Sequence, residues 1–82
     1  MKKLTIEVNE LFASQGTAKL DLLPHYESEA ISGAGEGNEV LLTGAGPVWL
    51  YLRLAHALHG KCRKLSYSSP VTGEVVIFDH SC

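Results

Sequence analysis

Residues 39–60 read EVLLTGAGPVWLYLRLAHALHG. The apolar run over residues 39–43 predicts a central strand, and the Gly-Ala-Gly-Pro sequence after it predicts a turn. Pro47 suits the first helical position, because the missing N–H of proline costs nothing there. Gly60 is a typical C-terminal stop. We therefore expect a strand, a tight turn and then a helix over residues 47–59.

The predicted helix has one apolar face. Leu50, Leu54 and Leu58 recur at helical spacing and form a stripe that can cover a sheet. Burying each leucine is worth roughly 1.5–3 kcal/mol, so this stripe should turn inward. The other face, which we expect to turn outward, carries an indole, a guanidinium and two imidazoles, from Trp49, Arg53, His56 and His59.

The first half of the chain predicts a hairpin. Apolar and polar residues alternate over residues 3–8 and 17–22, which is typical of half-buried strands, and the turn-forming residues between them would connect the pair. Residues 25–31 predict one or two helical turns. The glycine-rich residues 32–38 predict a flexible connection.

Two more strands are expected over residues 63–67 and 74–79, joined by a turn that contains Pro70 and Gly73. The resulting order of elements predicts an α+β fold in a single small domain, residues 1–82. We expect a sheet of four to five strands with one main helix packed on one face, in a Rossmann-like or ferredoxin-like arrangement.

Length and composition exclude several classes of protein. The chain has 82 residues, 45% of them hydrophobic and 20% charged, which fits one globular domain with a thin core that a partner subunit would help to stabilise. No apolar stretch approaches the roughly 20 residues that span a membrane. No apolar signal core follows the basic N-terminus, so we expect a cytoplasmic protein. Two cysteines, Cys62 and Cys82, lack metal-type spacing and are expected to stay reduced.

The charge is distributed unevenly. The net charge of −2 and the pI near 6.0 argue against a protein that coats double-stranded DNA or bulk RNA. Residues 1–40 carry three lysines and seven acidic side chains, whereas residues 41–82 carry four basic and two acidic ones. An anionic ligand is therefore expected on the second half of the chain.

The Gly44-Ala45-Gly46 turn is a candidate ligand site. A strand that ends in Gly-x-Gly before a helix exposes backbone N–H groups and the positive end of the helix dipole, which together bind anions. A purely structural turn is the alternative. Trp49 follows directly and would act as a ligand platform or a subunit contact, or else would cap the edge of the core.

Histidines are the candidate catalytic groups. His56 and His59 are three residues apart and could share a ligand, a proton relay or a metal ion. Two surface histidines near a helix C-terminus, favoured there by the dipole, are the alternative. His80 follows the last strand and would approach the helix if that strand lay beside the central one.

Three motifs together match a known family. They are Gly44-x-Gly46-Pro47-x-Trp49-Leu50, Leu54-Ala55-His56 with His59, and the Pro70-x-x-Gly73-x-Val75-Val76 turn and strand that ends at His80. Through them, the C-terminal half of the chain resembles the small Csx-type CRISPR-associated proteins that act as ring nucleases.

The resemblance implies a function. Members of that family degrade cyclic tetra-adenylate, the second messenger of type III CRISPR immunity, and were earlier described as manganese-dependent RNA deadenylases. It implies a cyclic oligoadenylate or a short RNA as ligand, Mn2+ as the one cofactor, and a homodimer over which a second dimer closes. The implied catalytic residues are His56, His59 and His80. The implied ligand-binding residues are Gly44, Ala45, Gly46, Trp49, Arg53 and Ser69.

The chain departs from the family at one turn, which reads Ser69-Pro70-Val71 where the family has Asp-Pro-Arg. The lost positive charge could be supplied by one of the basic residues of the second half, Arg53, Lys61, Arg63 or Lys64. Three functions follow as hypotheses: a ring nuclease, a binding protein that holds the messenger without cutting it, and a small dimeric interaction module without a nucleotide ligand.

Overall fold

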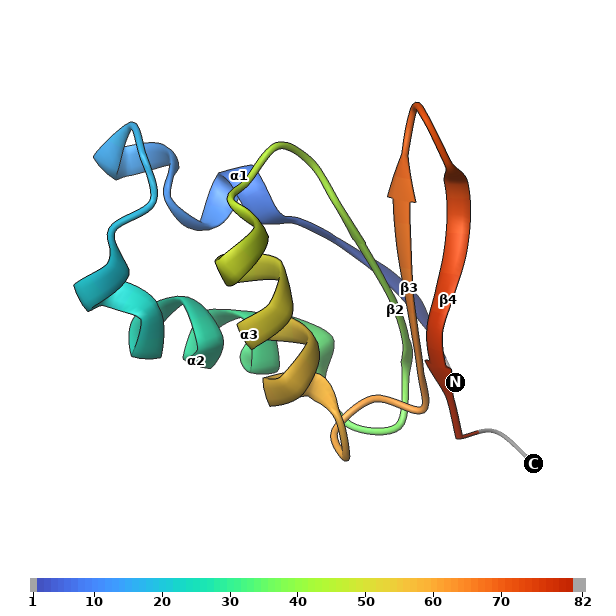
Figure 1. Ribbon diagram of the computed structural model, residues 1–82. Helices are drawn as coiled ribbons and strands as arrows, with labels where there is room; N and C mark the ends of the chain where they lie inside the picture. The colour runs from blue at the N-terminus through green and yellow to red at the C-terminus, as the bar shows by residue number, and fades with distance from the viewer. Residues whose placement is uncertain (1, 81–82) are drawn as a thin grey trace.

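The computed structural model describes residues 2–80 and contains one four-stranded sheet (Figure 1). Strands β1, β2 and β3 are parallel and lie in sequence order, and β4 is antiparallel to β3. This architecture confirms the α+β class and the predicted number of strands. The three parallel strands favour the Rossmann-like arrangement over the ferredoxin-like one. The strands are β1 (Lys3–Glu7), β2 (Glu39–Thr43), β3 (Lys64–Ser69) and β4 (Gly73–Asp79).

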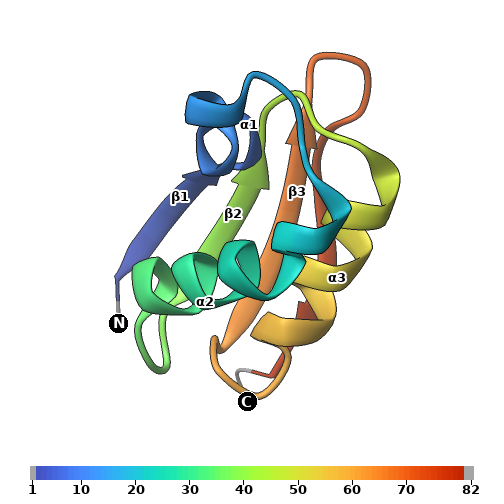
Figure 2. The same ribbon diagram turned by 90° about the vertical axis from the view of Figure 1, so that its left-hand side faces the viewer.

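Two helices cover one face of the sheet, so the molecule has two layers (Figures 1 and 2). They are α2 (Leu23–Ala34) and α3 (Val48–Leu58). One main helix was predicted, but α2 packs beside α3 on the same face. Within residues 2–80, no helix combines the length and the apolar character needed to cross a bilayer.

The core confirms the predicted apolar face of α3. Leu50, Leu54 and Leu58 are completely buried. They pack in one cluster with Val40 of β2 and Leu65 of β3, which are also completely buried. Burial of these side chains fixes how α3 is rotated against the sheet, and therefore which of its residues can reach a ligand.

The predicted hairpin is wrong. Instead of pairing with residues 17–22, β1 pairs in parallel with β2, Lys3 opposite Glu39. Residues 17–22 form a coil and a 3-10 turn, η2 (Leu20–Leu22), in which Leu20 is 66% exposed. The alternation of six residues was too short to distinguish a strand from the approach to a helix, and tertiary packing decided between them.

The predicted short helix is in fact three turns long. Its buried residues, Leu23, Tyr26, Ala30 and Ala34, recur every three or four positions, as they do on the inner face of a helix. Pro24 lies in the first turn of α2, where it is well tolerated. The flexible connection therefore begins only at Gly35, which ends the helix with a positive φ of 67°.

The parallel strands give the sheet two chemically different ends. At the carboxyl end, β1 leads into the short helix α1 (Val8–Leu11) and a 3-10 turn, η1 (Ala13–Gln15), and β2 leads into the turn before α3 (Figure 2). At the amino end, β3 begins directly after α3, and the last residue of β4, Asp79, pairs with Lys64. Candidate site residues occur at both ends.

Candidate functional site

His59 and His80 meet at the amino end of the sheet. Their Nε2 atoms lie 3.1 Å apart, and the ring centroids are 4.9 Å apart. Phe78 contacts both rings, at 5.0 Å from His59 and 4.9 Å from His80. Because one Nε2 must donate a proton and the other must accept it, the two imidazoles take opposite roles. The structure thus places a proton donor and a proton acceptor side by side.

The chain reaches this arrangement through the end of α3. His59 is the C-cap of the helix, and Gly60 turns the chain with a φ of 89°. The chain then passes Lys61 and reaches Arg63, the residue before β3, whose carbonyl accepts a hydrogen bond from the backbone N–H of His80 at 2.8 Å. His80 therefore reaches the helix from an edge strand, although we expected this only for a strand beside the central one.

His56 lies one turn earlier on α3 and is exposed. Its carbonyl accepts a hydrogen bond from the backbone N–H of His59, but the ring contacts found within residues 2–80 do not include its imidazole. The pair that the structure assembles is therefore His59 with His80, and not His56 with His59 as the spacing along the helix suggested.

Arg53 and Lys64 form ion pairs with acidic residues of the first half. Arg53 Nε lies 3.3 Å from Oε2 of Glu27, which joins α3 to α2. Lys64 Nζ lies 3.9 Å from Oε2 of Glu39 on the neighbouring strand. Lys61 and Arg63 are exposed in the segment between His59 and β3. These last two cations are the ones that the chain path brings next to the histidine pair.

At the carboxyl end, the Gly44–Gly46 turn is packed by the chain itself. A Cβ on Gly44 would lie 2.1 Å from Oδ1 of Asn9, and one on Gly46 would lie 2.8 Å from Cγ1 of Val8. The two glycines therefore let α1 approach the turn closely, which supports the structural alternative for their presence. The hydroxyl of Tyr51 also donates to the carbonyl of Gly44.

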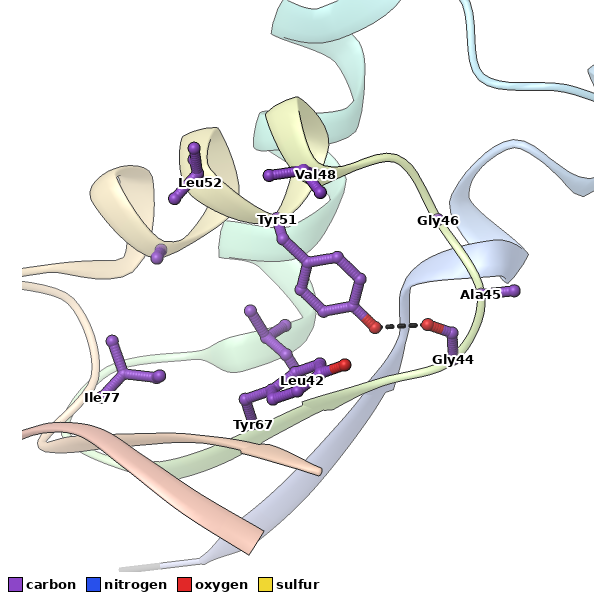
Figure 3. A pocket seen from close by; sticks show the side chains of 10 residues that line it. Leu42, Gly44, Ala45, Gly46, Val48, Tyr51, Leu52, Tyr67 and Ile77 are labelled. Atoms are coloured by element: carbon purple, nitrogen blue, oxygen red, sulfur yellow. Dashed lines mark hydrogen bonds between the residues drawn. The ribbon is translucent and has the colours of Figure 1, made fainter. Parts of the chain in front are cut away.

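One side of this turn opens into an apolar groove between α3 and β4 (Figure 3). Tyr51 and Tyr67 meet edge to face in it, at 5.2 Å between ring centroids. Burial, together with the neighbouring Tyr67, raises the pKa of the Tyr51 hydroxyl. Leu52 and Ile77 line the groove while remaining largely exposed. Its lining contains no charged side chain, so it suits an apolar partner better than a phosphate.

Trp49 does not face fully outward, and its packing supports the alternative interpretation, in which it caps the edge of the core. It is half-buried, packs against the core and lines a second cavity, on the other side of the Gly44–Gly46 turn, together with Asn9 and Phe12. Sequence reasoning missed these two residues because residues 9–16 were interpreted as a connection. The Asn-x-x-Phe spacing within a helical turn was the available signal.

Ser69 is occupied by its own turn. Its hydroxyl accepts a hydrogen bond from the backbone N–H of Thr72 at 3.1 Å and lies 2.9 Å from the Thr72 hydroxyl. Val71 at the tip is 93% exposed. The turn that carries charged residues in the resembling family is therefore a self-contained, uncharged turn in this chain.

Seven of the nine predicted site residues fall into two groups, and the other two, Arg53 and His56, lie between them along α3. Gly44, Ala45, Gly46, Trp49 and Ser69 lie at the carboxyl end, whereas His59 and His80 lie at the amino end. The 11 residues of α3 separate the groups by about 16 Å, at the usual rise of 1.5 Å per residue. A single nucleotide does not reach across this distance.

The described residues offer little to a metal ion. Within residues 2–80, no three side chains of His, Cys, Asp or Glu lie together as a metal site. Cys62 is buried and its thiol contacts the carbonyl of Leu58 at 3.5 Å. The expectation for Cys82 lies outside the described residues.

Fold and site together define a small Rossmann-like α+β domain with polar groups at both ends of a parallel sheet. The chain belongs to the Csx3 family, because a family model described as CRISPR-associated protein (Cas_csx3) matches residues 15–82. It is therefore a CRISPR-associated protein. No curated protein and no solved structure matches the chain.

Proposed function

We propose that this protein is a ring nuclease that binds cyclic tetra-adenylate and opens it at an interface between subunits, which would down-regulate type III CRISPR immunity. The observation that carries the proposal is the contact between His59 and His80, with Nε2 atoms 3.1 Å apart. Membership of the Csx3 family supports a role in CRISPR immunity. The geometry of the two imidazoles supports acid–base catalysis of ring opening.

In the proposed reaction, a ribose 2′-OH attacks the adjacent phosphorus while one imidazole takes its proton. The other imidazole gives a proton to the departing 5′-oxygen, so that a new P–O2′ bond replaces the P–O5′ bond. The product is a linear oligonucleotide with a 2′,3′-cyclic phosphate and a 5′-hydroxyl. Imidazole suits both roles because it titrates near neutral pH. Substrate entering between His59 and His80 would replace their mutual hydrogen bond.

Charge that develops on the phosphate oxygens needs a cation. Lys61 and Arg63 flank β3 at the amino end, and the carbonyl of Arg63 already binds the backbone of His80. We assign the stabilising charge to Arg63, assisted by Lys61, in place of the arginine that the family carries at the Val71 turn.

The separation of about 16 Å between the two groups supports a composite site. A base bound near Trp49 at the carboxyl end of one subunit would present its phosphodiester to the histidine pair of another subunit. This arrangement requires at least a homodimer and accommodates a dimer of dimers around the ring. The groove between α3 and β4, with Leu52 66% and Val48 74% exposed beside it, offers an uncharged surface for the homodimer contact.

Manganese has no step in this mechanism. Mn2+ prefers carboxylate oxygens, but no three His, Cys, Asp or Glu side chains of residues 2–80 come together as a metal site, and the family's aspartate position is a serine held in its own turn. The residues therefore do not fit a resident manganese ion. We expect turnover to continue in the presence of a chelator.

The test is to incubate the purified protein with cyclic tetra-adenylate, with and without Mn2+, and to follow both retention of the ligand and formation of linear product. Linear product supports the ring nuclease. Retention without product would favour a protein that sequesters the messenger, consistent with the uncharged Ser69–Val71 turn. Absence of both would leave a dimeric interaction module.

A further inference from the structure

The cavity beside Trp49 has the size of a small-ligand site. It lies between the segment around Phe12 and the Gly44–Pro47 turn, and its volume of about 430 Å³ falls within the roughly 300–1,000 Å³ of such sites. Half-buried aromatic side chains, Phe12 and Trp49, line it. Its lining includes the Asn9 side chain and no charged residue.

We propose that this cavity is an adenine-binding subsite, in which Phe12 and Trp49 flank the base and the side-chain amide of Asn9 reads its edge. This inference rests on the proposed function, because it names the part of the cyclic oligoadenylate that the carboxyl end holds. A base is the better occupant than a phosphate, since the cavity supplies aromatic surface and one amide but no cation.

Both aromatic side chains are fixed by the fold. Trp49 stands in the first turn of α3 and packs against the core. Phe12 contacts Tyr26 of α2 edge to face, at 6.4 Å between ring centroids. Flat aromatic surfaces accept any base, because every base has a π-face, so they provide binding without discrimination.

The Asn9 side chain distinguishes adenine from other bases. Its Oδ1 rests against Gly44, where a Cβ would lie only 2.1 Å away, so the amide is held at the rim of the turn. Within residues 2–80, its side-chain amide has no hydrogen-bonding partner. Asparagine pairs with adenine through both of its amide atoms, donating to N7 and accepting from the N6 amino group. Hypoxanthine, which lacks that amino group, cannot form the second bond.

The two new residues lie in the part of the chain that precedes the family match. The family model covers residues 15–82, whereas Asn9 and Phe12 come from α1 and the residue after it. The proposed subsite is therefore built jointly from the matched region, through Trp49, and from a segment that the match does not include.

Trp49 is the only tryptophan, so its fluorescence reports directly on this cavity. The experiment titrates the full chain with adenosine monophosphate, inosine monophosphate and ribose 5-phosphate while following Trp49 emission. We expect adenosine monophosphate to quench it, inosine monophosphate to bind about tenfold more weakly, and ribose 5-phosphate to have no effect. Asn9→Leu, which is nearly isosteric and removes both the donor and the acceptor, should abolish the preference for adenine over hypoxanthine.

The matched control is Gln15→Leu, which also replaces a side-chain amide by an apolar group, in the neighbouring turn and outside the lining of the cavity. It gives up only the hydrogen bonds that Gln15 makes with the Tyr26 hydroxyl, at 3.3 Å, and the Ser14 hydroxyl, at 2.7 Å. We expect it to preserve the preference for adenine. A second variant, Phe12→Leu, should weaken all purines by a similar factor, and thermal melting followed by circular dichroism verifies that each variant is folded.

Equal quenching by the two nucleotides, or an unchanged preference in Asn9→Leu, would overturn the subsite. An unaltered Trp49 emission while cyclic tetra-adenylate is retained and opened would also overturn it, yet would leave the ring nuclease intact. If cyclic tetra-adenylate is not retained but adenosine monophosphate still quenches Trp49 in an Asn9-dependent manner, the subsite stands and the ring nuclease does not.

Discussion

His59 and His80 are 21 residues apart in the sequence, yet they share one hydrogen bond between their Nε2 atoms at 3.1 Å. The contact joins the end of α3 to the end of β4, the two elements that flank β3. Each ring therefore depends on the other for its orientation, and both depend on Phe78, which contacts them from the strand.

Replacing either histidine of the pair should reduce the rate of ring opening more than ligand binding. We expect His59→Ala and His80→Ala each to lower turnover of cyclic tetra-adenylate by about 10²–10⁴-fold, because each removes one general acid or base. Retention of the ligand on a filter should change little. Single-turnover cleavage with excess protein separates the two quantities.

The matched control is His56→Ala, an identical substitution one helical turn earlier, where the imidazole is exposed and outside the pair. It should keep most of the activity. Equal losses in all three variants would show that the pair has no special role, and wild-type rates in His59→Ala and His80→Ala would remove it from the mechanism.

A mixture of two inactive variants should recover activity if the site is composite. Trp49→Ala damages the carboxyl end and His59→Ala the amino end, and α3 holds these ends about 16 Å apart. In a random mixture of equal parts, about a quarter of the sites would combine two intact ends from different subunits. We expect cleavage well above that of either variant alone.

The control for this experiment mixes His59→Ala with His80→Ala. Both substitutions damage the same end, so no combination of subunits restores it and the mixture should stay inactive. Activity of the Trp49 mixture that merely equals the mean of its parents would mean that each site lies within one subunit.

The sequence was sufficient to predict an element where its apolar pattern and its boundary residues indicated the same structure. The leucine stripe of α3, Pro47 before it and Gly60 after it all indicated the same helix, and the structure confirms it. The prediction of a hairpin was wrong because the six residues 17–22 alternate by chance, while the helical spacing of the buried residues of α2 begins only at Leu23. Short patterns carry little information when a neighbouring helix competes for the same residues.

The sequence could predict the individual residues of the candidate site, but not how they are arranged in space. Histidines and glycines could be selected by type and spacing, but the helix that connects them also separates them, and helical geometry alone would have given the distance. Arg53 was chosen for its charge, and its partner Glu27 lies on a helix that was predicted too short. The Asn-x-x-Phe spacing could have paired Asn9 with Phe12 on a helical turn, but their place beside Trp49 depends on how α1 packs on the Gly44–Gly46 turn.

A charge in the groove between α3 and β4 should prevent dimer formation. Leu52 is 66% exposed beside this groove, and burying a carboxylate there without a partner is unfavourable. We expect Leu52→Asp to shift the protein to a monomer in sedimentation velocity and to reduce ring opening in parallel. Leu20→Asp is the matched control, since Leu20 has the same exposure but lies on η2. A monomeric wild-type protein, or a dimeric Leu52→Asp, would contradict the assignment.

Alkaline pH should destabilise the protein through Cys62. Burial raises the pKa of this thiol in the folded chain, and a backbone hydrogen bond opposes the effect only in part. The folded state therefore holds the proton more tightly than the unfolded state. The corresponding stability is complete below the ordinary thiol pKa of about 8.5 and is lost as the pH rises through the folded pKa, with a slope of at most about 1.4 kcal/mol per pH unit. Urea unfolding between pH 7 and pH 10 measures this loss of stability.

The control is Cys62→Ala. Its unfolding free energy should lack the part of the decline that is due to the Cys62 thiol, while every other thiol and amine titrates equally in both proteins. Parallel stability curves for the two proteins would show that the Cys62 thiol is as free to ionise in the folded chain as in the unfolded one.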